Sequence, residues 1–177
     1  MSTTDLILLI LALLVAAVLA YAATRPADFR IARSTTIAAP PETIYRLIED
    51  FSRWVAWSPY EGRDPDMKRS RSGAPTGVGA VYAWQGDRRV GQGRMEIVEA
   101  EPPTRLVIQL DFIKPFEARN TAEFTLEPAG NGTKVTWAMT GKSPFMMRLM
   151  GLFMNMDRMI GKDFEAGLAS MKSAAEA

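Results

Sequence analysis

The sequence predicts an α+β fold in which an antiparallel sheet packs against one long C-terminal helix, preceded by one transmembrane helix. Residues 6–23 are apolar and uncharged, residues 80–141 alternate apolar and polar side chains between turn signals, and residues 145–171 repeat apolar side chains at helical spacing. We therefore expect an N-terminal anchor over residues 1–26 and one soluble domain over residues 27–177.

The apolar segment 6–23 is just long enough to span a bilayer core as a helix. Two interpretations of it remain open. Residues 20–22 (AYA) offer the small-x-small pattern of a signal-peptide cleavage site, whereas the preceding MSTTD contains no Lys or Arg, which favours an uncleaved anchor. Basic residues follow the segment at Arg25, Arg30 and Arg33, so the positive-inside rule predicts a single-pass membrane protein with its soluble domain in the cytoplasm.

The composition excludes several classes of function. The chain has 21 basic and 20 acidic residues, interspersed, so it carries no basic patch of the kind that binds nucleic acid. It contains no Cys and no His, which excludes disulfides, thiol chemistry, zinc ligation by these residues and every mechanism with a histidine base. We expect no cofactor, no metal and no nucleic-acid partner.

The first part of the soluble domain is expected to combine one strand, two short helices and a loop. Pro41 suits the first turn of a helix, and residues 58–79 are rich in Pro, Gly, Ser and charge, as loops are. The expected elements are a strand over 27–37, helical pieces over 42–49 and 51–55, and an edge strand near 67–71.

From residue 79 onward the hydrophobic period changes to two. Turn signals interrupt it at residues 86–87, 101–103 and 130–132. Strands joined by such short turns form an antiparallel sheet with one apolar face. The expected strands cover residues 79–85, 90–100, 105–113, 117–127 and 133–141.

The C-terminal third is expected to be helical with one break. Gly151 and Gly161 each weaken a helix by about 1 kcal/mol relative to Ala. We expect a short helix, with Ser143 as its cap and Pro144 at its first position, before a longer one that starts near Met154.

Several motifs resemble those of the START-like superfamily, also described as the polyketide cyclase/dehydrase and lipid-transport group. They are residues 34–42 (STTIAAPPE), Phe51 with Trp54 and 57–59 (WSP), 77–79 (GVG) and 132–137 (GTKVTW). The resemblance covers residues 30–175 and implies a helix-grip fold, a curved sheet wrapped around a long C-terminal helix with an apolar cavity between them. Members of the superfamily bind lipids, sterols, polyketides, plant hormones or quinones; a few catalyse cyclisation or dehydration, and others act as co-chaperones.

Aromatic and methionine side chains are the first candidates for the cavity wall. Pockets for small ligands are mainly apolar and aromatic, and flexible thioethers adapt to such ligands. The alternative is that these side chains only fill the core. The candidate ligand-binding residues, with two polar ones, are Trp57, Tyr82, Trp84, Phe112, Asn120, Met139, Phe153, Met156 and Asp157.

Each polar candidate has two interpretations. Asn120 occupies an inward position of its strand, where it either orients a ligand oxygen or is a satisfied buried amide beside a bulge. Asp157 is either an acid in the cavity or a member of an exposed ion pair on the helix.

We expect the protein to bind, and in one version to transfer, a hydrophobic small molecule or lipid while tethered to a membrane. An apolar ligand dissolved in the bilayer would then reach the pocket without crossing bulk water. One alternative is a cyclase- or dehydratase-like enzyme using Asp157 and Tyr82, which is less favoured because no paired carboxylates are evident. The other is a protein-interaction module with an exposed apolar patch.

Overall fold

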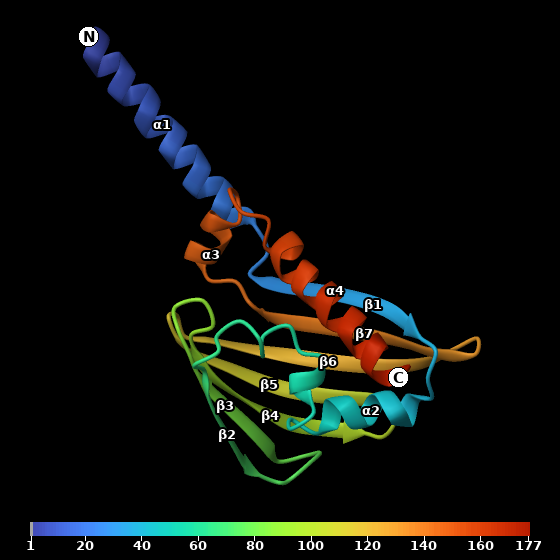
Figure 1. Ribbon diagram of the computed structural model, residues 1–177. Helices are drawn as coiled ribbons and strands as arrows, with labels where there is room; N and C mark the ends of the chain where they lie inside the picture. The colour runs from blue at the N-terminus through green and yellow to red at the C-terminus, as the bar shows by residue number, and fades with distance from the viewer. Residues whose placement is uncertain (1) are drawn as a thin grey trace.

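The computed structural model describes residues 2–177, which form a curved seven-stranded sheet, four α-helices and one short 3-10 helix (Figure 1). Every neighbouring pair of strands is antiparallel, in the spatial order β1-β7-β6-β5-β4-β3-β2. The predicted α+β helix-grip fold is confirmed. The strands are β1 (Asp28–Ile37), β2 (Lys68–Gly73), β3 (Ala80–Gln85), β4 (Gln92–Glu101), β5 (Arg105–Lys114), β6 (Ala118–Ala129) and β7 (Gly132–Lys142).

Helix α1 (Thr3–Thr24) projects away from the sheet (Figure 1). Its first turn is closed by a capping box, in which the Ser2 hydroxyl accepts from the Asp5 amide and the Asp5 carboxylate accepts from the Ser2 amide. The predicted apolar helix is confirmed: α1 is long and apolar enough to cross a membrane, and its composition also fits a signal sequence.

The concave face of the sheet holds the core because alternate side chains of each strand point inward. On β6 the buried residues are Asn120, Ala122, Phe124 and Leu126, separated by half-buried polar residues. On β7 Val135, Trp137 and Met139 face the same way, and Trp137 is the cross-strand partner of Phe124.

Helix α2 (Pro41–Glu49) and the 3-10 helix η1 (Trp54–Ala56) close one end of the sheet (Figure 1). Pro41 begins α2, as predicted, and Ile44 and Ile48 are buried. The indole of Trp54 donates to the Ile48 carbonyl at 2.9 Å, which ties η1 to the end of α2.

Helices α3 (Phe145–Met150) and α4 (Met156–Ala175) are separated by a turn that starts at Gly151, so the predicted helix break is confirmed. The predicted Ser143 cap is wrong. Pro144 is the N-cap residue instead of the first helical residue, and its side chain has no acceptor with which to cap the helix. Ser143 still belongs to the sheet, because its amide donates to the Ala27 carbonyl at 2.6 Å. Asn155 caps α4 by accepting from the Arg158 amide.

Arg148 on α3 holds this short helix against the end of α1. Its Nη1 donates to the Ala23 and Arg25 carbonyls at 3.0 and 3.1 Å. These carbonyls lie at the C-terminal end of α1, where a positive charge is favourable. The apolar helix is therefore bound directly to the domain that follows it.

Candidate functional site

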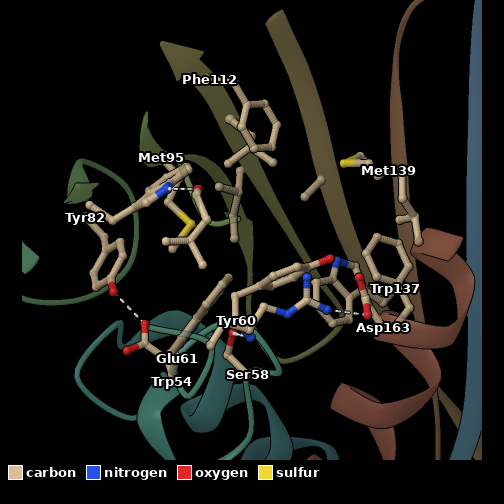
Figure 2. Close-up of a pocket in the computed structure, with 18 of the residues that line it drawn as sticks. Trp54, Ser58, Tyr60, Glu61, Tyr82, Met95, Phe112, Trp137, Met139 and Asp163 are labelled. Atoms are coloured by element: carbon tan, nitrogen blue, oxygen red, sulfur yellow. Dashed lines mark hydrogen bonds and ion pairs between the residues drawn. The ribbon is translucent and has the colours of Figure 1, made fainter. Parts of the chain in front are cut away.

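A cavity of about 370 Å³ lies between the concave face of the sheet, α4 and the loop that joins η1 to β2 (Figure 2). Its wall is mostly apolar, as expected of a pocket for a small hydrophobic ligand. The lining residues from the sheet are Tyr82, Trp84, Met95, Ile108, Leu110, Phe112, Ala122, Trp137 and Met139, and those from α4 are Met159, Ile160, Asp163 and Phe164. The remaining lining residues are Trp54 from η1 and, from the connecting segments, Ser58, Tyr60, Glu61, Arg63, Met67, Arg89 and Val90.

Strand parity explains why the sheet residues converge. Ile108, Leu110 and Phe112 stand two apart on β5 and therefore share one face, as do Trp137 and Met139 on β7. The sheet thus supplies a continuous apolar wall, and the polar groups come mainly from α4 and the loops.

At one side of the cavity, Tyr82 and Glu61 are joined by a hydrogen bond (Figure 2). The Tyr82 hydroxyl donates to Glu61 Oε1 at 2.5 Å, and Arg69 Nε donates to the other carboxylate oxygen at 2.7 Å. Burial, followed by the bond to Glu61, raises the pKa of the Tyr82 phenol, so it stays protonated as a donor. The negative charge of Glu61 is balanced by its ion pair with Arg69.

A second polar group lies near α4, where Figure 2 shows Tyr60, Trp137 and Asp163 close together. Arg63 forms an ion pair with Asp163, and its guanidinium lies 4.8 Å from the centre of the Tyr60 ring. Burial, and secondarily the negative charge of Asp163, raises the pKa of the Tyr60 phenol. The two carboxylates that line the cavity, Glu61 and Asp163, are thus both paired with arginines.

Among the residues singled out from the sequence, four line the cavity: Tyr82, Trp84, Phe112 and Met139. Trp57 lies in the core instead, only 2% exposed, and its indole donates to the Leu47 carbonyl at 2.8 Å. Its ring packs edge to face with that of Phe124, with centroids 5.9 Å apart. Trp57 is therefore a core residue and does not line the cavity.

Asn120 is buried but is not part of the cavity wall. Its Nδ2 lies 3.9 Å from the Met139 sulfur, and its side-chain oxygen occupies the space that a side chain at Gly141 would need. The pairing of β6 with both neighbours runs without a register shift through Asn120, so no bulge reverses its direction. Asn120 therefore packs behind Met139, which does line the cavity.

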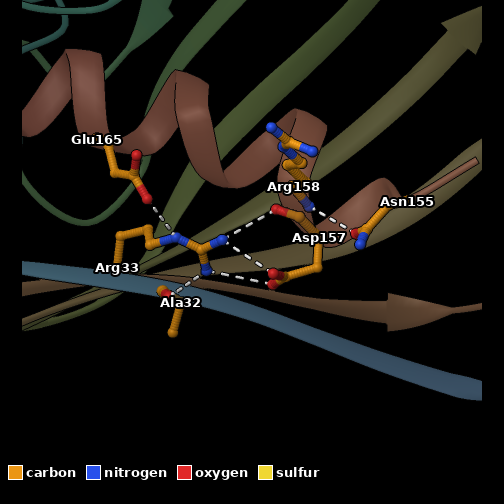
Figure 3. Close-up of polar contacts among 6 residues, drawn as sticks. All are labelled: Ala32, Arg33, Asn155, Asp157, Arg158 and Glu165. Carbon is orange, nitrogen blue, oxygen red and sulfur yellow. Dashed lines mark hydrogen bonds and ion pairs between the residues drawn. The ribbon is translucent and has the colours of Figure 1, made fainter.

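The other three singled-out residues lie outside the cavity wall. Phe153, between α3 and α4, is 80% exposed, and Met156 begins α4. Asp157 accepts from the Arg33 guanidinium at 2.9 and 3.2 Å, and Glu165 accepts from the same guanidinium at 2.8 Å (Figure 3). This exposed cluster joins β1 to α4.

The loop residues at the cavity were missed by sequence reasoning as binding candidates. Ser58, Glu61, Arg63 and Met67 lie in a segment without hydrophobic periodicity, so no pattern shows which side chains face inward. Tyr60 comes directly after the motif residues 57–59 (WSP), and this position was the one sequence signal that it lies near the site.

The pairing of the lining carboxylates bears on the acid–base chemistry that the cavity could perform. A general base needs an available carboxylate or a neutral amine near the substrate, and both lining carboxylates are held by arginines. In residues 2–177 no three acidic side chains converge to hold a metal ion. The site offers an apolar chamber with a few hydrogen-bond donors.

Comparison with known proteins identifies the family to which this sequence is similar. The sequence profile of the family described as polyketide cyclase / dehydrase and lipid transport matches residues 28–176. No curated protein matches the chain in a sequence search.

Solved structures share the fold at low identity. Protein CV1439 from Chromobacterium violaceum is 16% identical with a TM-score of 0.60, over 86% of this chain and 99% of that one. Protein MLL2253 from Mesorhizobium loti is 20% identical with a TM-score of 0.58, over 84% and 97% of the two chains. The Aha1 protein from Colwellia psychrerythraea, solved as a dimer, is 18% identical with a TM-score of 0.55, over 84% and 96%.

Proposed function

Because this chain belongs to the polyketide cyclase/dehydrase and lipid-transport family, we propose that it binds a hydrophobic small molecule or lipid in the cavity beside α4. Residues 1–26 form its membrane anchor in this proposal, and residues 27–177 form the binding domain, on the cytoplasmic side. The observation that carries the proposal is the apolar chamber of about 370 Å³, which is within the size range of small-molecule sites.

The position of α1 supports a membrane-derived ligand. Helix α1 leaves the domain beside α3, to which Arg148 binds it (Figure 1). The surface of α3 and the turn after it is apolar and exposed, through Phe145, Met146, Met147, Met150, Phe153 and Met154. If α1 lies in a bilayer, this surface lies next to it, and an apolar ligand has a short path between membrane and domain.

Ligand content of the full-length chain tests the proposal. The protein would be extracted in mild detergent, transferred to lipid nanodiscs and examined by native mass spectrometry and by organic extraction. We expect one bound hydrophobic molecule per chain that survives washing and raises the thermal midpoint when re-added. An empty chain that also ignores a panel of lipids, sterols and polyketides would contradict the proposal and favour a protein-interaction module.

A cavity-filling variant gives this experiment a matched control. Ala122 on β6 lines the cavity, so Ala122→Phe places a ring in the space that the ligand would occupy. Thr125→Phe adds the same ring on the outward face of the same strand. We expect Ala122→Phe to lose the bound molecule and Thr125→Phe to retain it.

Turnover is the third measurement, because it separates a carrier from an enzyme. Asp157 is exposed and paired with Arg33 outside the cavity wall. Asp157→Asn is therefore expected to bind the ligand as the wild type does, with no difference in turnover between the two. A cyclase or dehydratase acting through Asp157 would instead bind its ligand and stop converting it.

A further inference from the structure

The indole N–H of Trp137, a residue of the cavity wall, has no hydrogen-bond partner within residues 2–177. The chain has four tryptophans. The indole nitrogens of Trp54, Trp57 and Trp84 each donate to a backbone carbonyl, at 2.9, 2.8 and 3.0 Å. Trp137 is only 4% exposed, and within residues 2–177 its Nε1 is buried without any acceptor. A buried donor left unpaired destabilises the protein, so an acceptor is expected from outside the chain.

The packing around Trp137 leaves the Nε1 edge of its indole opposite the edge that lies toward Gly167. Phe164 stacks on its ring at 4.0 Å and Phe124 at 5.1 Å, so aromatic rings pack against its faces. The Cζ3 edge lies toward Gly167 and Pro59, since a Cβ at Gly167 would come 2.9 Å from Trp137 Cζ3 and from Pro59 Cδ. Nε1 lies on the opposite edge of an indole, and Trp137 is one of the residues that line the cavity.

Tyr60 provides a second donor beside the first. Its ring meets Trp137 edge to face, with centroids 6.5 Å apart, and both side chains line the cavity. Within residues 2–177 the Tyr60 hydroxyl makes no hydrogen bond, unlike that of Tyr82, and its raised pKa keeps it protonated. A carbonyl oxygen has two acceptor positions and suits two donors.

The charges at this corner select against an anion. Arg63 is the nearby cation, and Asp163 already neutralises it. A carboxylate placed at Trp137 would approach Asp163 and gain no free positive charge in return. A neutral oxygen gains both hydrogen bonds without that repulsion.

We propose that Trp137 Nε1 and the Tyr60 hydroxyl together bind the carbonyl oxygen of an otherwise apolar, uncharged ligand such as a ketone or an ester. The subsite rests on the proposed hydrophobic-ligand function and names the class of molecule that the cavity takes. A pure hydrocarbon and a fatty-acid anion are both disfavoured by it.

Fluorenone and fluorene test the proposal, because they share one ring skeleton and differ by a carbonyl against a methylene group. Binding of each to the full-length chain in nanodiscs would be measured by calorimetry, with empty nanodiscs as the partition blank. We expect fluorenone to bind roughly tenfold more tightly, the factor that a hydrogen bond to a buried donor supplies. Equal binding of the two would overturn the subsite and leave the hydrophobic-ligand function standing, whereas binding of neither would count against that function itself.

Three variants assign the preference to the two donors. Trp137→Phe keeps an aromatic ring against Phe164 and removes the N–H, so the fluorenone preference should fall to roughly the threefold that Tyr60 supplies, while fluorene still binds. Tyr60→Phe removes only the hydroxyl and should reduce the preference roughly threefold. Trp84→Phe is the control, because this cavity tryptophan already donates to Val90; it should change both affinities alike and preserve their ratio.

An NMR measurement on the wild-type chain tests the same subsite without any substitution, so it does not require that the variants fold. The indole N–H resonance of Trp137 should move further downfield on addition of fluorenone than on addition of fluorene, while the indole signals of the other three tryptophans should respond alike to the two probes. A shift of equal size with both probes would mean that the N–H responds to burial alone, and the subsite would be wrong.

Discussion

Trp84 on β3 lies directly over Gly93, its cross-strand partner on β4. A Cβ at position 93 would come within 2.5 Å of two atoms of the indole and 2.6 Å from the Asp111 carbonyl oxygen. The missing side chain is therefore what allows the indole to lie along the cavity wall. Glycine at such a strand position marks a close approach of another group.

Gly93→Ala should destabilise the domain and disturb the cavity together. Overpacking of this kind typically costs about 1–3 kcal/mol, and the indole is the movable neighbour, so we expect weaker ligand binding as well. Urea unfolding and ligand titration measure the two effects. Gly62→Ala is the control, since a Cβ there meets nothing within 4 Å; equal stability of the two variants would contradict the argument.

Truncation of a buried and of an exposed phenylalanine should have very different effects on the free energy of unfolding. Phe164 on α4 is 2% exposed and stacks on Trp137, whereas Phe153 is 80% exposed. Phe164→Ala should cost about 3–5 kcal/mol of unfolding free energy. Phe153→Ala should cost less than about 0.5 kcal/mol. A large loss at Phe153 in detergent-free solution would show that this side chain packs against a surface of the protein.

The pair of Arg33 and Asp157 gives the domain an acid-sensitive contact. Hydrogen bonds from Arg33 hold the pKa of Asp157 below its usual 3.8, so the unfolded chain takes up this proton first as the pH falls. The contribution to stability is fully present above that value and is lost as the pH falls through the lower folded-state pKa. Thermal midpoints measured down to pH 3.8 and below should fall more steeply for the wild type than for Asp157→Asn. Parallel curves would rule out this contact as a source of acid sensitivity.

A charge in the centre of α1 tests the anchor. Leu13 lies mid-helix and is exposed. Leu13→Arg should reduce membrane insertion, because Arg at the centre of a spanning helix costs about 2.5–3.5 kcal/mol. The fraction of protein that stays with membranes after an alkaline wash measures this, and Leu13→Ala is the matched control. A mature protein whose intact mass lacks α1 would instead identify a cleaved signal sequence.

The elements of the fold were predictable because their patterns are local. The alternation over 118–127 places Ala122, Phe124 and Leu126 inward without any knowledge of the partner strands. The helix break at Gly151 likewise follows from local propensity. The cap failed at Ser143 because its backbone is committed to the long-range pairing of β7 with β1, which no local pattern reveals.

The site was less predictable, since it depends on contacts between distant segments. Within residues 2–177 Trp137 has no acceptor while the other three tryptophans have one, and this difference depends on the long-range packing around each indole. The loop residues Tyr60 and Arg63 reach the cavity from a segment without periodicity. Asp157 shows the converse: its partner Arg33 is 124 residues away in sequence.

Only residues 25–27 separate the end of α1 from the start of β1, and Arg148 fastens α3 across this junction. A chain of that length spans at most about 10 Å. If α1 lies in a bilayer, this short connection keeps the cavity close to that membrane surface, so the reach of the domain is set by the anchor and not by a flexible linker.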